Sequence, residues 1–403
     1  MTLPDRVVVV GASAAGLGTV EELRRHGYSG ALALIGAEAH LPYDRPPLSK
    51  QLLTGAWAAD KIALTTAARL AELDVDLRLD VTASALDAAR GTVTLADGAK
   101  LAADAVVVAT GCTPRHLAGS ADVAGDAVVA GVHTLRTVDD SLQLRSELGH
   151  GRRLVVIGAG FLGLEVAAVA SGLGSEVTVV SAQPPLLRVV GSAVSRSLAA
   201  LHSANGVQLR IGSAAARLMV DDDRVCGVEL ADGSSIAADS VVVAVGATPT
   251  TDWLIGSGLT IQDGVVCDSR LQAAPFVYAV GDIARWHDPR LGRLMRVEHR
   301  MHATESASVA AANLLGADAE FSPIPFWWTD QYSAKIQAYG WVGGTAHLWD
   351  GELADHRSVV LYSDGGIVTG ALGWNSVRQL RAARALVVAG TPLADAGPTT
   401  PLA

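Results

Sequence analysis

The residues best suited to chemistry are a lysine and a glutamate in two separate segments. Lys50 ends the stretch "LPYDRPPLSK" (41–50), which also presents Arg45 and whose prolines exclude an ordinary helix. Glu165 follows Gly163 at the start of a predicted helix. If the two side chains met across two domains, they would position an ammonium group beside an electron-accepting ring. Spacing alone leaves that pairing open.

Two similar units of the chain surround these residues. Residues 6–36, which begin "RVVVVGASAAGLGTVEELRR", and residues 152–181 are each predicted to form a buried strand, a glycine turn, a helix and a second strand. In a dinucleotide-binding unit the first glycine permits the turn, the middle one admits the pyrophosphate, and the third lets helix and strand pack closely. The helix N-terminus adds free N–H groups. The candidate glycines are Gly11 and Gly16 in the first unit and Gly158, Gly160 and Gly163 in the second.

The first unit departs from this pattern at its middle position, where Ser13 replaces glycine. A serine adds only one hydroxymethyl group, and its hydroxyl could donate to a phosphate oxygen, so we expect the site to tolerate it. Glu38 lies just beyond the second strand, where a carboxylate can accept hydrogen bonds from a ribose. The alternative is a solvated loop carboxylate.

The second unit departs from the pattern at the end of its second strand. Ser181 stands where an acidic residue would normally hold the 2′-hydroxyl of NAD. Repulsion of a 2′-phosphate is therefore weakened, and Arg188 lies close downstream. The choice between NADH and NADPH stays open.

Matching strands at the end of each unit indicate the domain organisation. "ADAVVVATGCTP" (103–114) and "ADSVVVAVGATP" (238–249) are alike, and "FVYAVGDIARW" (276–286) returns to a buried strand. The sequence therefore predicts an α/β fold with two Rossmann-like dinucleotide-binding domains, the second inserted in the first, plus a C-terminal α+β domain. The predicted boundaries are 1–114 with 240–322, then 115–239, then 323–403. Thr110, Gly246 and Gly281 are further cofactor-binding candidates at these strand ends.

The predicted third domain contains the short strands "KIQAYGWVG", "RSVVLYSDGG" and "IVTGALGW". Asn375 and Ser376 are expected to cap the final helix, which has its apolar residues on one side. Residues 391–403 are expected to form a frayed tail.

Composition excludes several classes of function. The formal net charge of −10 argues against nonspecific nucleic-acid binding, although an acidic protein partner needs only a local basic patch. Three cysteines without a C-x-x-C pair favour a reduced, cytoplasmic setting and no disulfide framework. The start "MTLPDR" is not a signal peptide, and no apolar run reaches the ~20 residues that span a membrane. His299 and His302 lack further ligands at coordination spacing, so no metal site is expected.

With these motifs the chain resembles a known family from about residue 5 to about residue 390. It is similar to the FAD-dependent NAD(P)H:ferredoxin reductases that supply haem monooxygenases and Rieske-type dioxygenases, within the glutathione-reductase-like superfamily. The blocks "PYDRPPLSK" and "WTDQY" are specific to this branch, whereas the glycine motifs are shared more widely. The resemblance implies hydride transfer from NADH or NADPH to FAD, followed by single-electron transfers to an iron–sulfur ferredoxin.

The resemblance also implies roles for individual residues. Lys50 and Glu165 match the family's pair near flavin N5, and Trp328 matches an aromatic at the flavin edge, where the ferredoxin is thought to dock. The resemblance implies that Ser13 is part of an FAD site, because family members often carry serine at the middle position of the first glycine motif. The other residues implied to contact FAD are Ala15, Glu38, Arg45, Val81 through its backbone, Arg136, Asp282 and Val297.

Three departures from the family leave alternatives open. Ser181 replaces the usual glutamate, Arg300 replaces a tryptophan after "VEH", and His302 replaces a small polar residue. With Arg285, Arg293 and Arg296, Arg300 could form the basic patch that an acidic ferredoxin requires, or these could be solvated loop arginines. One alternative is a related flavoprotein whose acceptor is rubredoxin, oxygen or a quinone. Another is a flavin- or nicotinamide-binding sensor with little reductase activity. The sequence does not indicate the oligomeric state.

Overall fold

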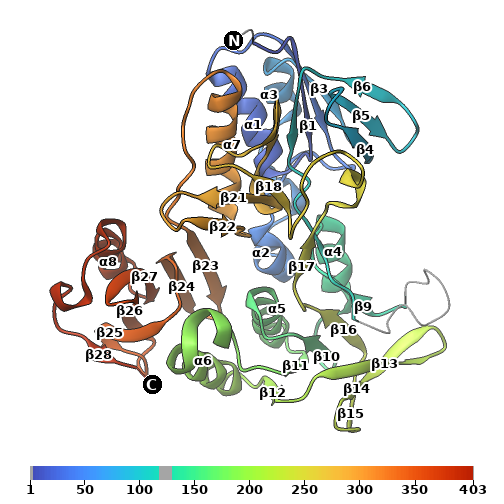
Figure 1. The fold of residues 1–403 in the computed structure, drawn as a ribbon. Helices are drawn as coiled ribbons and strands as arrows, with labels where there is room; N and C mark the ends of the chain where they lie inside the picture. The colour runs from blue at the N-terminus through green and yellow to red at the C-terminus, as the bar shows by residue number, and fades with distance from the viewer. Residues whose placement is uncertain (1–2, 118–128, 403) are drawn as a thin grey trace. The chain divides into compact units, whose positions relative to one another are not determined.

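The computed structural model describes residues 3–117 and 129–402 (Figure 1). The chain divides into two compact units. Unit 1 comprises residues 1–44, 60–113 and 248–325, and unit 2 comprises residues 45–59, 114–247 and 326–403.

A six-stranded sheet forms the centre of unit 1, in the order β19-β20-β7-β1-β2-β3. All neighbouring strands are parallel except the edge pair β19 and β20. The valines of β1 and β7 are buried, as expected for a parallel sheet covered on both faces. The strands are β1 (Arg6–Val10), β2 (Ala31–Ile35), β3 (Val75–Arg78), β7 (Ala105–Val108), β19 (Gln272–Ala274) and β20 (Val277–Ala279).

Helices α1 (Ala14–Arg25) and α7 (Arg300–Leu314) of unit 1 pack side by side, seen in blue and orange in Figure 1. Small residues allow this approach: a Cβ on Gly18 would lie 3.4 Å from the Cβ of Ala307. The remaining elements are α3 (Ala67–Glu72), the sheet of β4 (Ala83–Asp87), β5 (Thr92–Leu95) and β6 (Lys100–Ala102), and the sheet of β18 (Val265–Cys267), β21 (Ala284–Asp288) and β22 (Arg293–Met295), with short turns η2 (Ala59–Ile62), η3 (Asp252–Leu254) and η4 (Gly281–Ile283). Strands β8 (Cys112–Pro114) and β17 (Ala247–Pro249) lie where the chain passes between the units in sequence.

Unit 2 contains a second parallel sheet, in the order β12-β11-β10-β16-β9. Its strands are β9 (Val132–His133), β10 (Arg153–Ile157), β11 (Glu176–Ser181), β12 (Gln208–Ile211) and β16 (Ser240–Val243). The other elements are α4 (Val138–Glu147), α5 (Phe161–Gly172), α6 (Leu187–Ala204), η1 (Pro46–Ser49), α2 (Gln51–Thr54) and the antiparallel sheet of β13 (Ala215–Asp221), β14 (Arg224–Leu230) and β15 (Ser235–Ala237).

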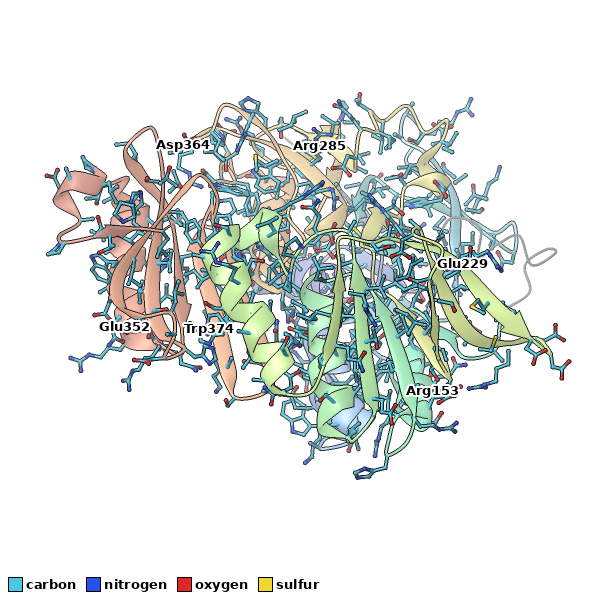
Figure 2. All side chains as sticks on the ribbon, turned by 90° about the horizontal axis from the view of Figure 1, so that it is seen from below. Arg153, Glu229, Arg285, Glu352, Asp364 and Trp374 are labelled. Carbon is cyan, nitrogen blue, oxygen red and sulfur yellow. The ribbon has the colours of Figure 1, made fainter. Side chains whose placement is uncertain are left out.

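The C-terminal part of unit 2 is an antiparallel sheet in the order β23-β24-β27-β26-β25-β28, with helix α8 (Val377–Ala389) packed on it. Trp374, at the end of β27, is fully buried (Figure 2). The three predicted strands are present. The strands are β23 (Phe326–Gln331), β24 (Ala334–Gly340), β25 (Thr345–Glu352), β26 (Arg357–Asp364), β27 (Ile367–Trp374) and β28 (Thr400–Pro401).

Two predictions about this C-terminal part are wrong. The tail is not frayed: turn η5 (Leu393–Asp395) precedes β28, which pairs with β25, and Trp349 donates to the carbonyl of Ala396. Ser376 does precede α8, but its hydroxyl donates to the Trp374 carbonyl and does not cap the helix. Pairing of β28 with β25 and the hydrogen bond from Trp349 hold residues 391–402 in place, although the composition of this segment is typical of a disordered terminus.

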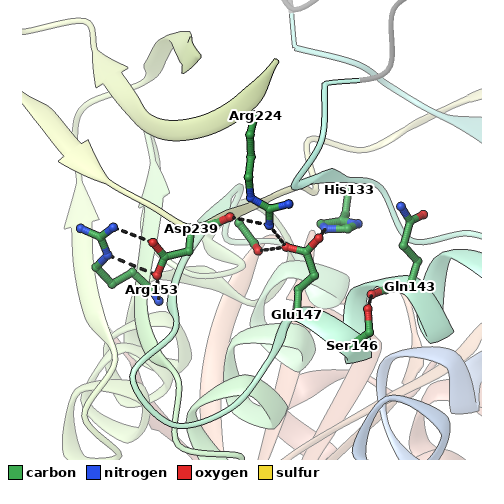
Figure 3. Close-up of polar contacts among 8 residues, drawn as sticks. His133, Gln143, Ser146, Glu147, Arg153, Arg224 and Asp239 are labelled. Atoms are coloured by element: carbon green, nitrogen blue, oxygen red, sulfur yellow. Dashed lines mark hydrogen bonds and ion pairs between the residues drawn. The ribbon is translucent and has the colours of Figure 1, made fainter. Parts of the chain in front are cut away.

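A polar cluster in unit 2 joins the end of α4 to the sheet (Figure 3). Glu147 accepts hydrogen bonds from Arg224 and Ser240, and the buried ring of His133 lies 3.8 Å from its second oxygen. Burial alone would raise the pKa of Glu147, but the bonds from Ser240 and Arg224 and the proximity of His133 outweigh it and hold the pKa below 4.5. Burial lowers the pKa of His133 from 6.5, so its ring is neutral near pH 7.

We predict that Glu147→Gln lowers the free energy of unfolding by about 1–3 kcal/mol, because two donors lose a charged acceptor. Both shifts also predict acid sensitivity. As the pH falls below 6.5, the unfolded chain binds a proton at residue 133 that the folded protein does not bind, so the free energy of unfolding decreases. As the pH falls further, below 4.5 and through the lowered pKa of folded Glu147, the stabilisation that the ionised carboxylate provides is also lost. Urea unfolding from pH 3.5 to 8 measures both effects.

The matched control is Glu229→Gln. Glu229, labelled in Figure 2, pairs with Arg217 on an exposed hairpin, so its loss should cost under about 1 kcal/mol. Equal losses for the two variants would show that the Glu147 cluster does not stabilise unit 2.

Candidate functional site

The first glycine turn leaves no space for larger residues at two of its three positions. Gly11 has φ +115°, and a Cβ there would lie 2.2 Å from the carbonyl oxygen of Ala109. A Cβ on Gly16 would lie 1.8 Å from the carbonyl oxygen of Gly11. Ser13 precedes α1 with extended backbone angles, and its hydroxyl does not cap the helix. A serine therefore fits here without strain and leaves its hydroxyl for a ligand at the helix N-terminus.

The candidate residues that follow strands β2, β3 and β7 of unit 1 already have partners within the protein. Glu38 accepts a hydrogen bond from the hydroxyl of Tyr43. The N–H of Val81 donates to the carbonyl of Gly36, so a ligand contact through the Val81 backbone would use its carbonyl oxygen. The hydroxyl of Thr110 donates to the carbonyl of Thr250 at 3.0 Å. These contacts fix the chain around the carboxyl ends of β1, β2 and β7, where nucleotides bind in open α/β sheets.

The Gly281–Asp282 turn is fixed by helix α7. The N–H of Gly281 donates to the hydroxyl of Ser306 at 2.9 Å, and its carbonyl lies 3.2 Å from Nε2 of His302. A Cβ on Gly281 would lie 3.0 Å from that of Ala15 in α1. The Gly281–Asp282 peptide is therefore held directly beside the start of α1. Val297, the remaining implied flavin contact of unit 1, is 7% exposed.

His302 is a core residue of unit 1. Its ring stacks on Trp286 with centroids 4.9 Å apart, and burial lowers the pKa to about 4. Burial, with the neighbouring His302, also lowers the pKa of His299 to about 4. Among the described residues, no group of three His, Cys, Asp or Glu side chains is arranged to hold a metal ion.

The four arginines considered as a basic patch differ in their partners. Arg300 pairs with Asp44, and Arg296 pairs with Glu298 at 2.8 Å and with Asp263 at 3.2 Å. Their charges are therefore neutralised locally. Arg285, labelled in Figure 2, donates to the carbonyl of Gln262, and Arg293 is exposed.

The second glycine turn, in unit 2, repeats the geometry of the first. A Cβ on Gly158 would lie 2.3 Å from the carbonyl oxygen of Ala244, and one on Gly163 would lie 2.2 Å from that of Gly158. Gly160 differs, because a Cβ there meets nothing within 4 Å. This open space at the N-terminus of α5 fits a pyrophosphate that approaches the backbone.

The edge of this second site has no acidic residue at the expected ribose position. Ser181 ends β11, and its hydroxyl oxygen accepts from the N–H of Gln183 at 3.3 Å. Arg188 is exposed near the start of α6, and Gly246 is exposed with φ +98°.

Lys50 and Glu165 form a buried ion pair in unit 2. Their side chains are 12% and 7% exposed, and Nζ of Lys50 lies 2.6 Å from Oε2 of Glu165. The ammonium also donates to the carbonyl of Pro46 and the hydroxyl of Ser49, which in turn donates to Glu165. The pairing that spacing left open is present, and both residues belong to one unit.

The other candidate residues of unit 2 lie directly before η1, in the β9–α4 loop and on β23. Arg45 donates to the carbonyl of Arg136, whose own N–H donates to Asp140 at 2.8 Å. Trp328 is half-buried on β23 and stacks with Phe326 at 5.9 Å. The next residue, Thr329, points to the opposite face and donates to Glu165 at 2.7 Å.

Sequence reasoning missed Ser49 and Thr329 as partners of Glu165. A signal for Thr329 was available, because side chains alternate along a strand and "FWWTDQ" places it on the same face as Trp327. Trp327 packs on Phe161 at the start of α5, with ring centroids 4.7 Å apart.

Comparisons with known proteins decide the family. The pyridine nucleotide-disulphide oxidoreductase model matches residues 5–312, and the reductase C-terminal model matches residues 326–400. The chain belongs to the pyridine nucleotide-disulphide oxidoreductase family. The predicted resemblance, the α/β fold class and the assignment as an oxidoreductase are thereby confirmed, and membership implies use of a flavin and a nicotinamide nucleotide.

Several relatives are similar to this chain over almost their whole length. The ferredoxin–NAD(+) reductase component of the p-cumate 2,3-dioxygenase system of Pseudomonas putida is 35% identical over 99% of this chain and 98% of its own. The reductase in the covalent putidaredoxin reductase–putidaredoxin complex has a TM-score of 0.91 at 32% identity, over 96% of this chain and 94% of its own. The ferredoxin reductase for the CYP199A2 system of Rhodopseudomonas palustris has the same score and identity, over 98% and 97%.

No helix among the described residues is long and apolar enough to cross a bilayer. Within residues 3–117 and 129–402 no disulfide joins the three cysteines: Cys112 and Cys267 are buried, and Cys226 is exposed. The described residues therefore contain no cystine of the kind to which the word disulphide in the family's name refers.

We predict that Gly16→Ala destabilises unit 1 strongly, by several kcal/mol, because the added methyl group overlaps a backbone oxygen that cannot move away alone. Gly18→Ala, on the same helix, should be neutral or stabilising, since its methyl meets only Ala307 at ordinary distance. Urea unfolding and the amount of flavin that copurifies with each variant measure the difference. Similar behaviour of the two variants would contradict the close approach at Gly16.

Proposed function

We propose that the protein is an FAD-dependent NAD(P)H:ferredoxin reductase that supplies electrons to a monooxygenase or dioxygenase through an iron–sulfur ferredoxin. The observation that supports this most is similarity over nearly the full length of relatives that are themselves named as ferredoxin reductases of oxygenase systems. The two glycine turns and the separate C-terminal sheet supply the parts that such an enzyme needs.

The first glycine turn fits the FAD pyrophosphate. Its N–H groups and the Ser13 hydroxyl would hold the phosphates, Glu38 the adenosine ribose, and the fixed Gly281–Asp282 turn the ribityl chain. The other residues for which the family resemblance implies an FAD contact are Val297 in unit 1 and Arg45, Lys50, Arg136 and Trp328 in unit 2. The second turn, with open space at Gly160, would hold the nicotinamide nucleotide.

When bound, FAD accepts a hydride and releases electrons singly, which nicotinamide alone does not do. The protein contributes binding, orientation and charge. Lys50 would present a fixed cation near flavin N5, from where it could stabilise the negative charge that the ring as a whole gains on reduction. Its hydrogen bonds to Glu165, Ser49 and Pro46 hold the ammonium in one position, so little reorganisation is needed during the reaction.

The first test is an anaerobic titration of the purified yellow protein with NADH and, separately, with NADPH. We expect near-stoichiometric bleaching of the flavin band by at least one nucleotide. With Ser181 in place of an acidic residue, we expect less discrimination against NADPH than a carboxylate would impose. A colourless protein, or one that neither nucleotide bleaches, would favour the sensor alternative.

The acceptor is tested by adding candidates to the reduced protein. A ferredoxin should oxidise it faster than rubredoxin, a quinone or oxygen. Faster turnover with one of the last three would favour the alternative flavoprotein instead.

We predict that Lys50→Met lowers the rate of flavin bleaching about 100-fold, as expected for the loss of a fixed charge aimed at developing charge. The variant also leaves Glu165 buried without its cation, at a cost of about 3–5 kcal/mol. Lys50→Met/Glu165→Gln removes that cost and should recover stability but not rate. Stopped-flow absorbance and urea unfolding separate the two effects.

The control for charge alone is Lys61→Met, which removes an exposed lysine from η2. It should leave the rate of bleaching unchanged. A double variant as fast as the wild type would remove the role assigned to Lys50.

A further inference from the structure

A row of hydrogen bonds within unit 2 continues from the Lys50–Glu165 pair. Thr329 lies 2.7 Å from Oε1 of Glu165, and Nε2 of Gln331 lies 3.1 Å from the Thr329 hydroxyl. Nε2 of His202 lies 2.8 Å from Oε1 of Gln331. The hydroxyl of Tyr332 lies 3.1 Å from Nδ1 of His202. We call Thr329, Gln331, His202 and Tyr332 the donor chain.

The donor chain is excluded from solvent except at its far end. Counted as whole residues, Glu165 is 5% exposed and Gln331 is 1% exposed, and Thr329 and His202 are fully buried. Tyr332 is partly exposed. Alternation along β23 places Thr329 and Gln331 on one face, toward α5, while His202 comes from near the end of α6. Buried polar groups in this position must satisfy one another.

The chemistry of the side chains fixes the direction of donation. An ionised carboxylate only accepts, so the single proton of the Thr329 hydroxyl must point to Glu165. The Thr329 oxygen must then accept from the amide NH₂ of Gln331, which turns the amide oxygen toward His202.

The same reasoning fixes the tautomer of His202 and the role of Tyr332. His202 donates from Nε2 to Gln331, so its Nδ1 carries a lone pair and accepts from the Tyr332 hydroxyl. Burial lowers the pKa of His202 from 6.5, despite the bond to Gln331, and burial raises the pKa of Tyr332. Near pH 7 a neutral imidazole and a neutral phenol therefore match the roles required of them. All four hydrogen bonds are donated toward Glu165.

The opposite direction requires a different charge on Glu165. If the side-chain amide of Gln331 were flipped, its oxygen would face Thr329. The single Thr329 proton would then be shared between two acceptors, the Gln331 amide oxygen and the Glu165 carboxylate. The 2.7 Å contact to Glu165 would then need a proton on that carboxyl group. The direction of the donor chain and the charge of Glu165 are therefore coupled.

We propose that Thr329, Gln331 and His202 are positioning residues that keep Glu165 ionised and thereby keep Lys50 cationic and in place. Hydrogen bonds in a buried chain polarise one another, so each donor strengthens the next. The proposal deepens the proposed function and rests on it, because Lys50 acts there beside the flavin.

The groups that contact Glu165 come from three elements packed on α5. The segment of η1 and α2 supplies Ser49 and Lys50, and β23 supplies Thr329. Lys50 is the charged group among these contacts. His202 contacts Gln331 and Tyr332 and packs its ring 5.2 Å from that of Tyr332.

The test uses Thr329→Val, which replaces the hydroxyl with a methyl group of the same size, and Thr329→Ser, which retains it. Infrared spectra of the oxidised, flavin-loaded protein without nucleotide report the protonated carboxyl band, assigned by its loss in Glu165→Gln. We expect the pH at which this band reaches half its height to rise by about one unit in Thr329→Val, since a donor to the charged form is lost. Thr329→Ser should restore the wild-type value.

Substitutions further along the donor chain should have smaller effects in the same direction. Gln331→Met should shift the half-height pH less than Thr329→Val, and His202→Leu less again. The matched control is His347→Leu, which removes another buried histidine of unit 2. His347 is hydrogen-bonded to Ser363 and is not part of the donor chain. An unchanged midpoint in Thr329→Val, or an equal shift in His347→Leu and His202→Leu, overturns the proposal.

A second readout separates this proposal from the proposed function. The acid limb of the pH profile for flavin bleaching should move with the infrared midpoint in each variant. If neither nucleotide bleaches the wild type but the infrared midpoints shift as expected, the reductase function fails and the coupling to Glu165 stands. If bleaching is normal and the midpoints do not shift, the positioning role fails alone.

Discussion

A buried glutamate that remains charged needs donors on both of its oxygens, and Glu165 obtains them from separate segments of unit 2. Lys50 and Ser49 reach one oxygen, and Thr329 reaches the other. Unpaired, either charge would cost several kcal/mol to bury. The proline-rich segment and the first strand of the C-terminal sheet are therefore tied to α5 by the same carboxylate. This arrangement fixes an ammonium group without exposing it to screening by solvent.

The two glycine turns show which positions of a dinucleotide motif are set by the protein itself. The first and third glycines are required in both copies because a Cβ would overlap backbone atoms. The middle position differs, since Gly160 faces open space and Ser13 has ordinary extended angles. Packing therefore does not require glycine at Gly160, and a small hydroxyl-bearing residue at this position can serve as a donor. The first and third glycines of the motif are thus set by packing, and the middle position is left open for the proposed ligand.

The strands and turns of both parallel sheets could be predicted from sequence because their signals are local. In the sequence, runs of valine, glycines at fixed spacing and the repeat of the whole unit identify these strands and turns. The Lys50–Glu165 pair could be suggested but not established, since the two residues are far apart in the chain. The tail and the Asn375–Ser376 cap were predicted wrongly, because pairing with β25 and local hydrogen bonds override composition. His202 gave no signal, as a histidine near the end of an amphipathic helix is ordinary.

The departures at Arg300 and His302 are compensated within unit 1, which bears on whether they have removed the flavin site. Arg300 pairs with Asp44, so its charge is balanced locally. His302 fills an aromatic niche beside Trp286 and Phe321, and its Nε2–H donates to the Gly281 carbonyl because that oxygen can only accept. Both side chains thus support the existing backbone. The Gly281 peptide is held from both sides, by Ser306 and by His302, so neither departure disrupts the backbone at the proposed flavin site. This geometry fits a reductase and a flavin-binding sensor equally, and the rate of flavin reduction is what distinguishes them.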